Sequence, residues 1–201
     1  MNFAEYNVKD ANLEEILLAL KSLDTVEAVA LGGSRSTGAS DENSDYDIYI
    51  YCAEIPTAET RENLLGKYCS IAEFGNHYWE SEDNTVMNNG IPVDIIYREV
   101  DRFGRYIDTV IKGGKAFNGY TTAFWHNIKN SKVLFDKTGT FTKFRDMAQI
   151  DFPENLRSAI IKNNRNLLNG KLPSYDRQIK KAQERGDIVS VNHRITAFLE
   201  S

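Results

Sequence analysis

The chain has 201 residues, of which 41% are hydrophobic and 26% are charged. These fractions are typical of a soluble globular protein and exclude a disordered or fibrous chain. No apolar run approaches the roughly 20 residues that cross a bilayer, and the first ten residues lack the basic and apolar regions of a secretory signal. Two cysteines, Cys52 and Cys69, are too few for a disulfide framework. We therefore expect a cytoplasmic protein without membrane contact.

Charge is distributed unevenly along the chain. Residues 1–152 contain 15 Lys and Arg against 24 Asp and Glu, whereas residues 153–201 contain 9 against 5. The acidic part disfavours non-specific binding to nucleic acid. The basic part either closes over an anion held by the acidic part or is solvated helix surface, and charge alone supports both interpretations equally.

Apolar periodicity predicts alternating helices and strands in the first three quarters of the chain. Helices are predicted over residues 11–22, 59–69, 100–111 and 121–129. Strands are predicted over residues 26–31, 45–52, 91–97 and 133–135. The polar stretch 74–84 is predicted to be an irregular loop. It either lines a pocket or, in the favoured interpretation, is solvated around the single anchoring aromatic Trp79.

The remainder of the chain is predicted to be helical. Pro153 fits the first turn of a helix that stops at Gly170, a second helix follows Pro173, and Asp187 caps a third. The third helix reaches Ser201 without a stop signal, which leaves open a longer natural chain. We therefore expect two domains, residues 1–145 and 146–201.

The stretch from Leu31 to Tyr51 combines a glycine-rich turn with two acidic residues. Gly32 and Gly33 end a predicted strand and let the backbone approach a ligand closely. A helix beginning at Ser34 would add backbone N–H groups and a hydroxyl, which together form an anion site. A glycine turn by itself is a weak signal, so the case for a phosphate site depends on the residues that follow.

Asp45 and Asp47 are the stronger signal. Side chains alternate along a strand, so the two carboxylates share a face, with Cα atoms roughly 6.6 Å apart. Like charges placed so closely repel each other, and a divalent cation with phosphate oxygens would remove the repulsion. Asp94 lies within the apolar run Val93–Ile96, where an unpaired charge would be costly. The alternative for each Asp is a structural cap, but the three together with the glycine turn favour a catalytic site.

Residues 31–51 resemble the signature of the nucleotidyltransferase superfamily, whose fold is shared with DNA polymerase beta. In that signature Gly-Ser is followed by Asp-x-Asp, and a third carboxylate comes from a later strand. Gly-Gly-Ser-Arg-Ser-Thr-Gly and Ser-Asp-Tyr-Asp are most similar to the bacterial aminoglycoside- and lincosamide-type small-molecule enzymes and their uncharacterised relatives. The resemblance implies an α/β (α+β) nucleotidyltransferase domain, with a small mixed sheet flanked by helices, followed by an all-helical C-terminal domain.

The resemblance also implies roles for individual residues. Gly33 and Ser34, after Gly32, would hold the β- and γ-phosphates of ATP or another nucleoside triphosphate. Asp45 and Asp47 would bind two Mg²⁺ ions, and Asp94 would share one metal and accept the proton of the acceptor hydroxyl. Arg35 follows the turn directly and is equally consistent with a phosphate contact and with a surface arginine.

The resulting hypothesis is Mg²⁺-dependent transfer of a nucleoside monophosphate, AMP from ATP, to a hydroxyl of a small molecule, with release of pyrophosphate. The alternatives are a protein acceptor, as in antitoxin-type relatives, and a nucleotide-binding regulatory module without turnover. The acceptor, the preferred base and the oligomeric state stay open, because no motif in the sequence specifies them.

Overall fold

The computed structural model describes residues 10–41 and 44–200. The chain divides into two compact units. The sheet unit runs to Tyr106 and resumes over Trp125–Gln149, and the helical unit contains Ile107–Phe124 and the residues from Ile150 onward. Among the described residues, no helix is long and apolar enough to cross a membrane. The division into domains at 145/146 stays a prediction.

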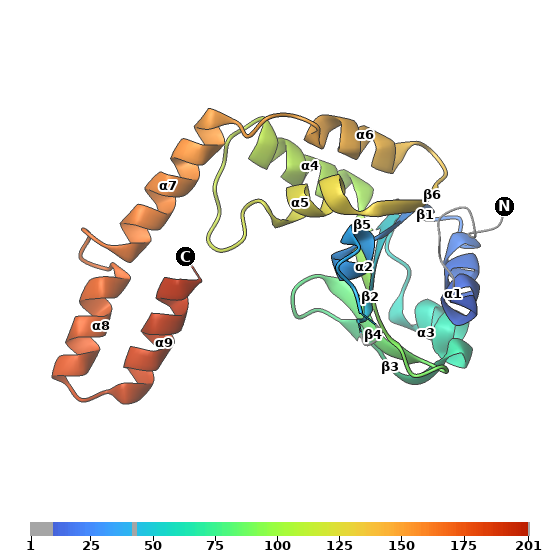
Figure 1. Cartoon of the computed structure of the whole chain (residues 1–201), viewed down its shortest axis with the longest axis horizontal. Coiled ribbons are helices and arrows are strands. Elements are labelled where there is room, and N and C mark those ends of the chain that lie inside the picture. The colour runs from blue at the N-terminus through green and yellow to red at the C-terminus, as the bar shows by residue number, and fades with distance from the viewer. Residues whose placement is uncertain (1–9, 42–43, 201) are drawn as a thin grey trace. The chain divides into compact units, whose positions relative to one another are not determined.

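A six-stranded mixed sheet forms the sheet unit (Figure 1). The strands lie in the order β3-β4-β5-β2-β1-β6, and the pair β2–β5 is parallel while the other neighbours are antiparallel. Their bounds are β1 Val26–Leu31, β2 Tyr46–Cys52, β3 Cys69–Asn76, β4 Ser81–Met87, β5 Pro92–Glu99 and β6 Lys132–Asp136. The parallel pair brings together two strands that are separated by β3 and β4 in the sequence.

One face of the sheet carries the main hydrophobic core. It is covered by α1 (Ala11–Lys21) and α3 (Ala58–Leu65), which lie on the same side of the sheet in Figure 1. The α1 helix forms because its apolar residues recur at helical spacing and the Asp10 side chain accepts hydrogen bonds from the first backbone N–H groups. The buried cluster includes Leu13, Ile16, Leu17, Leu20, Tyr46, Ile48, Ile50, Cys52, Val93, Ile95 and Tyr97.

The opposite face is covered over β2 and more open over β4 and the first part of β5. Tyr51 of β2 packs edge-on against Phe103 of α4 (Val100–Ile111) and Phe141 of α6 (Thr140–Ala148), with ring centres 5.2 Å apart in both pairs. Trp125 of α5 (Ala123–Asn130) donates its indole N–H to the carbonyl of Ala148. The β2 strand is therefore buried on both faces, whereas along β4, and along β5 as far as Tyr97, buried residues alternate with more exposed ones.

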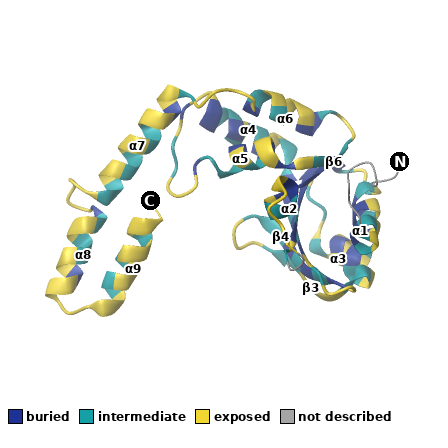
Figure 2. Ribbon diagram, in the orientation of Figure 1, coloured by how far each residue is buried: buried dark blue, intermediate teal, exposed yellow. Residues whose placement is uncertain are grey.

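The helical unit contains α7 (Glu154–Leu168), α8 (Tyr175–Glu184) and α9 (Ile188–Leu199). Asp187 caps α9 by accepting a hydrogen bond from the Ser190 N–H, which confirms the predicted helix start. The three helices are largely exposed in Figure 2. Apolar residues of α9 form part of this exposed surface, since Ile188 and Leu199 are 70% and 78% exposed.

The predicted mixed α/β class with a helical C-terminal part is confirmed, but two local predictions were wrong. The predicted helix over 59–69 ends at Leu65, a short 3₁₀ turn (Gly66–Tyr68) follows, and Cys69 already begins β3. The predicted loop over 74–84 contains the end of β3 and the first half of β4. Polar residues fill this hairpin because one face of it is not covered, so the apolar pattern that marks a buried strand is missing.

Candidate active site

The glycine turn, Gly32–Ser34, lies directly against side chains of β2. Gly33 has a φ of 58°, and a Cβ atom placed on it would stand 1.7 Å from the Asp47 carboxylate oxygen Oδ2. A Cβ on Gly32 would stand 2.3 Å from Cε2 of Tyr49. The Gly32 N–H donates to the Asp47 carbonyl at 2.8 Å. Only glycine therefore fits the turn at this distance from β2, since any side chain would displace Asp47 or Tyr49.

Two of the three predicted carboxylates lie side by side on neighbouring strands. Asp47 of β2 is paired with Asp94 of β5 in the parallel register, and both side chains are half-buried. The exposed Asp45 directly precedes β2. Burial raises the pKa of Asp47, and the negative charges of Asp45 and Asp94 raise it further. The charges of Asp45 and Asp94 therefore both act on Asp47.

A pair of asparagines connects β3 and β4 to Asp94. The side-chain amide nitrogen of Asn84 on β4 donates to Oδ1 of Asp94 at 2.9 Å, and the side-chain amide nitrogen of Asn76 on β3 donates to Oδ1 of Asn84 at 2.7 Å. These bonds fix the orientation of the Asp94 carboxylate on the open face of the sheet. Neither asparagine stands out in the sequence as a site residue, because the two strands that place them were not predicted.

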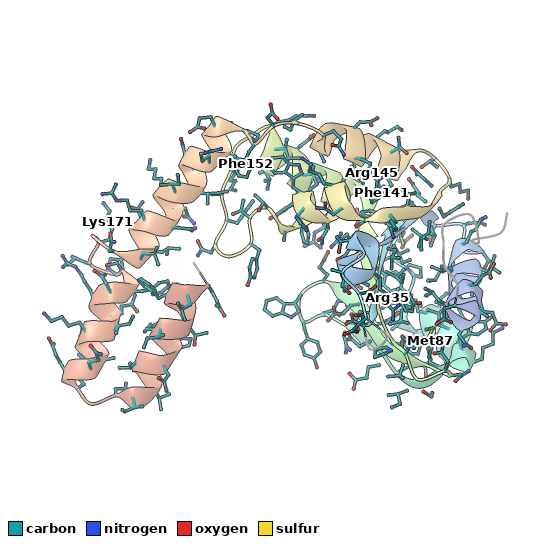
Figure 3. The ribbon with its side chains drawn as sticks, in the orientation of Figure 1. Arg35, Met87, Phe141, Arg145, Phe152 and Lys171 are labelled. Atoms are coloured by element: carbon teal, nitrogen blue, oxygen red, sulfur yellow. The ribbon has the colours of Figure 1, made fainter. Side chains whose placement is uncertain are left out.

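Arg35 joins the short helix α2 (Gly33–Thr37) to the segment that enters β2. Its Nε donates to the carbonyls of Ser44 and Asp45 at 2.9 and 3.0 Å, and its guanidinium carbon lies 4.0 Å from the centre of the Tyr46 ring (Figure 3). Arg35 therefore holds the backbone that carries Asp45 close to the glycine turn.

The donor set fits a hard divalent cation such as Mg²⁺, because it consists of carboxylate oxygens whose mutual repulsion a cation would relieve. Within residues 10–41 and 44–200, however, no three His, Cys, Asp or Glu side chains form a ready-made metal-binding group. An ion at this site would therefore need further oxygen ligands, and Mg²⁺ in phosphate-binding sites commonly takes them from substrate phosphates.

Comparison with known proteins gives a match at the level of the family. The family model described as "Nucleotidyltransferase domain" matches residues 13–117, which is just over half of the 201 residues. The matched segment includes the glycine turn and all three carboxylates. No curated protein matches the chain. On the strength of this match, the chain belongs to the nucleotidyltransferase domain family.

Proposed function

We propose that the protein transfers AMP from ATP to a hydroxyl group of a small molecule and releases pyrophosphate. Membership of the family implies transfer of a nucleoside monophosphate from a nucleoside triphosphate, with Mg²⁺. The choice of adenine as the nucleobase and of a small molecule as the acceptor goes beyond what membership of the family implies. The observation that carries the proposal is the register pairing of Asp47 with Asp94, together with the close approach of Gly33 to the Asp47 carboxylate.

In the proposed reaction each residue has a defined task, and Asp94 has two. The backbone of Gly33 and the hydroxyl of Ser34 would hold the β- and γ-phosphates, and Asp45, Asp47 and Asp94 would hold Mg²⁺. The bound cation would neutralise the charge that develops on the attacking and leaving oxygens. The oxygen of the acceptor hydroxyl bonds to the α-phosphorus while the bond from the α-phosphorus to pyrophosphate breaks. Asp94 accepts the proton that the hydroxyl loses in this step.

A small-molecule acceptor is supported by the charge and the open surface of the site. The acidic first part of the chain disfavours a nucleic-acid acceptor. On the open face of the sheet, half-exposed Asn84 and Glu82 stand beside Asp94. Burial is the main cause of the raised pKa of Glu82, and the negative charge of Asp94 raises this pKa further. These groups offer hydrogen-bond partners next to the proposed base.

The test is a screen of nucleoside triphosphates and hydroxyl acceptors for Mg²⁺-dependent release of pyrophosphate, with Asp94→Asn as the inactive control. We expect release with ATP and a product whose mass has increased by one adenylate group. A modified protein in place of a modified small molecule would support the antitoxin-type alternative. Binding of ATP without release, across the whole screen, would contradict the enzyme proposal and leave a regulatory module.

A further inference from the structure

A buried arginine lies on the same sheet face as the candidate site. Arg98 of β5 is 4% exposed, and its Nε and Nη2 donate to the two carboxylate oxygens of Glu80 at 2.9 and 2.7 Å. Its Nη1 donates to the hydroxyl of Tyr51 at 3.2 Å. A bidentate ion pair between a guanidinium and a carboxylate has a fixed geometry, so Glu80 sets the plane of the guanidinium.

The Arg98 guanidinium in turn lies against the ring beneath the glycine turn. Its carbon is 4.2 Å from the centre of the Tyr49 ring. The same ring leaves no room for a Cβ atom on Gly32. A continuous series of contacts therefore runs from Glu80 through Arg98 and Tyr49 to Gly32.

We propose that Arg98, oriented by Glu80, is a positioning residue for the glycine turn. By holding the Tyr49 ring in place, it fixes the height of Gly32 and Gly33 above β2 and thereby the position of the β- and γ-phosphates. This inference rests on the proposed function, because it assumes that the turn binds those phosphates. A purely structural pair would stabilise the fold without favouring triphosphates over monophosphates.

The protein contains a matched control pair on the other face of the sheet. Arg61 and Asp83 are 2% and 0% exposed and form an ion pair of 2.8 Å. The Arg61 guanidinium carbon lies 4.4 Å from the centre of the Tyr97 ring, which belongs to the main core. Both pairs thus combine a buried arginine, a carboxylate and a tyrosine ring, but this one faces away from the glycine turn.

The experiment compares Glu80→Gln with Asp83→Asn in the full chain. Calorimetry measures the affinities for ATP and AMP in Mg²⁺, and thermal unfolding measures stability. We expect Glu80→Gln to weaken ATP binding by about tenfold, the size of one charge-assisted hydrogen bond, while AMP affinity is unchanged. Asp83→Asn should leave the ratio of the two affinities at the wild-type value even where it lowers the melting temperature more. Equal ratios in the two variants would overturn the proposal.

A second measurement needs no nucleotide. Hydrogen exchange in the ligand-free protein should be faster at the Gly32 amide, which is bonded to the Asp47 carbonyl, in Glu80→Gln but not in Asp83→Asn. If wild-type protein binds no triphosphate, the proposed function fails, and this readout still tests the series of contacts. If Glu80→Gln does not fold, Arg98→Lys takes its place, since a lysine keeps the positive charge but cannot form the bidentate ion pair with Glu80. Unchanged exchange at Gly32 in the folded variant would overturn the positioning role.

Discussion

Asp47 is surrounded by charges of its own sign and is half-buried, so its charged form is costly in the metal-free protein. We predict that Asp47→Asn, which keeps the shape and removes one charge, lowers turnover in Mg²⁺ by orders of magnitude because a metal ligand is lost. In EDTA the variant should be no less stable than wild type, and up to about 1 kcal/mol more stable. Thermal unfolding in EDTA and turnover in Mg²⁺ are the two measurements.

Asp136 provides the control for this substitution. Its carboxylate accepts hydrogen bonds from the backbone N–H groups of Phe141 and Thr142 at the start of α6. Asp136→Ala should therefore lower stability by about 1 kcal/mol, the usual cost of losing a helix cap, and leave turnover unchanged. If Asp47→Asn behaves like Asp136→Ala, destabilised but active, Asp47 is structural.

The raised pKa of Asp47 also predicts a dependence on pH. The folded state holds this proton more tightly than the unfolded chain, so the penalty of the charged form is present at neutral pH. This free-energy penalty decreases as the pH falls through the raised pKa of folded Asp47 toward the ordinary pKa of Asp. The stability difference between wild type and Asp47→Asn in EDTA should therefore shrink on acidification. A difference that is constant from pH 7 to pH 4 would contradict the predicted repulsion.

Asn84 allows the orientation of Asp94 to be tested. Asn84→Ala removes the amide that donates to Asp94, so we expect turnover to fall about 10- to 100-fold, as for other residues that orient a metal ligand. Triphosphate affinity should change much less. Asn76→Ala removes a group that is one hydrogen bond further from Asp94, so turnover should fall less than in Asn84→Ala. Equal losses in the two variants would indicate a general disturbance of the hairpin.

At the scale of elements, the glycine turn predicts different outcomes at two glycines with positive φ. Gly33→Ala would combine strain at a φ of 58° with a collision against the Asp47 carboxylate, whereas a Cβ on Gly38, at a φ of 79°, would meet nothing within 4 Å. Both substitutions should destabilise by about 1 kcal/mol through strain. Only Gly33→Ala should also abolish triphosphate binding, as measured by calorimetry. Retained binding in Gly33→Ala would show that the turn is not the phosphate site.

Elements with a marked apolar pattern between turn signals were predictable from the sequence, whereas some half-polar or short elements were missed. The strand Val26–Leu31 was predicted with its observed bounds because it is an apolar run between turn signals. The β3–β4 hairpin was missed because its exposed face is polar, and α6 because its short sequence falls where a domain boundary was expected.

The same distinction applies to the candidate site. Asp45, Asp47 and Asp94 stand out in the sequence because carboxylates border or interrupt apolar strands. That Asp47 and Asp94 are neighbours depends on the register of β2 against β5, which no local pattern encodes. Asn84, Glu80 and Arg98 acquire their partners only through that register and the pairing of β4 with β5, so they resemble ordinary polar residues in the sequence.

At the scale of the whole molecule, the excess of basic residues after Pro153 predicts an electrostatic contribution to triphosphate binding. The double substitution Lys180→Ala and Lys181→Ala removes two exposed positive charges of α8. We expect ATP affinity to fall about fivefold at low salt and to approach wild type at high salt. Calorimetry at two ionic strengths measures the effect.

Lys137→Ala with Lys143→Ala is the matched control, because these exposed lysines belong to the sheet unit and their removal changes net charge equally. An identical loss in both double variants would assign the effect to net charge, and no loss in either would show that the basic segment is solvated surface. Substitution is preferable to truncation, since residues 107–124 belong to the same unit as α7–α9. The Asn118 side chain, for example, accepts a hydrogen bond from Asn163.

The place of β1 between β2 and β6 has a consequence for how the protein is made. β1 is apolar and buried, and its second partner, β6, ends only at Asp136. During synthesis the ribosome therefore releases both carboxylate strands and the glycine turn while one edge of β1 is still unpaired. An unpaired apolar edge readily recruits strands from other chains. All residues of the proposed active site are thus synthesised before β6 is available to complete the sheet. A nascent chain that stalls before residue 132 would therefore be prone to aggregate.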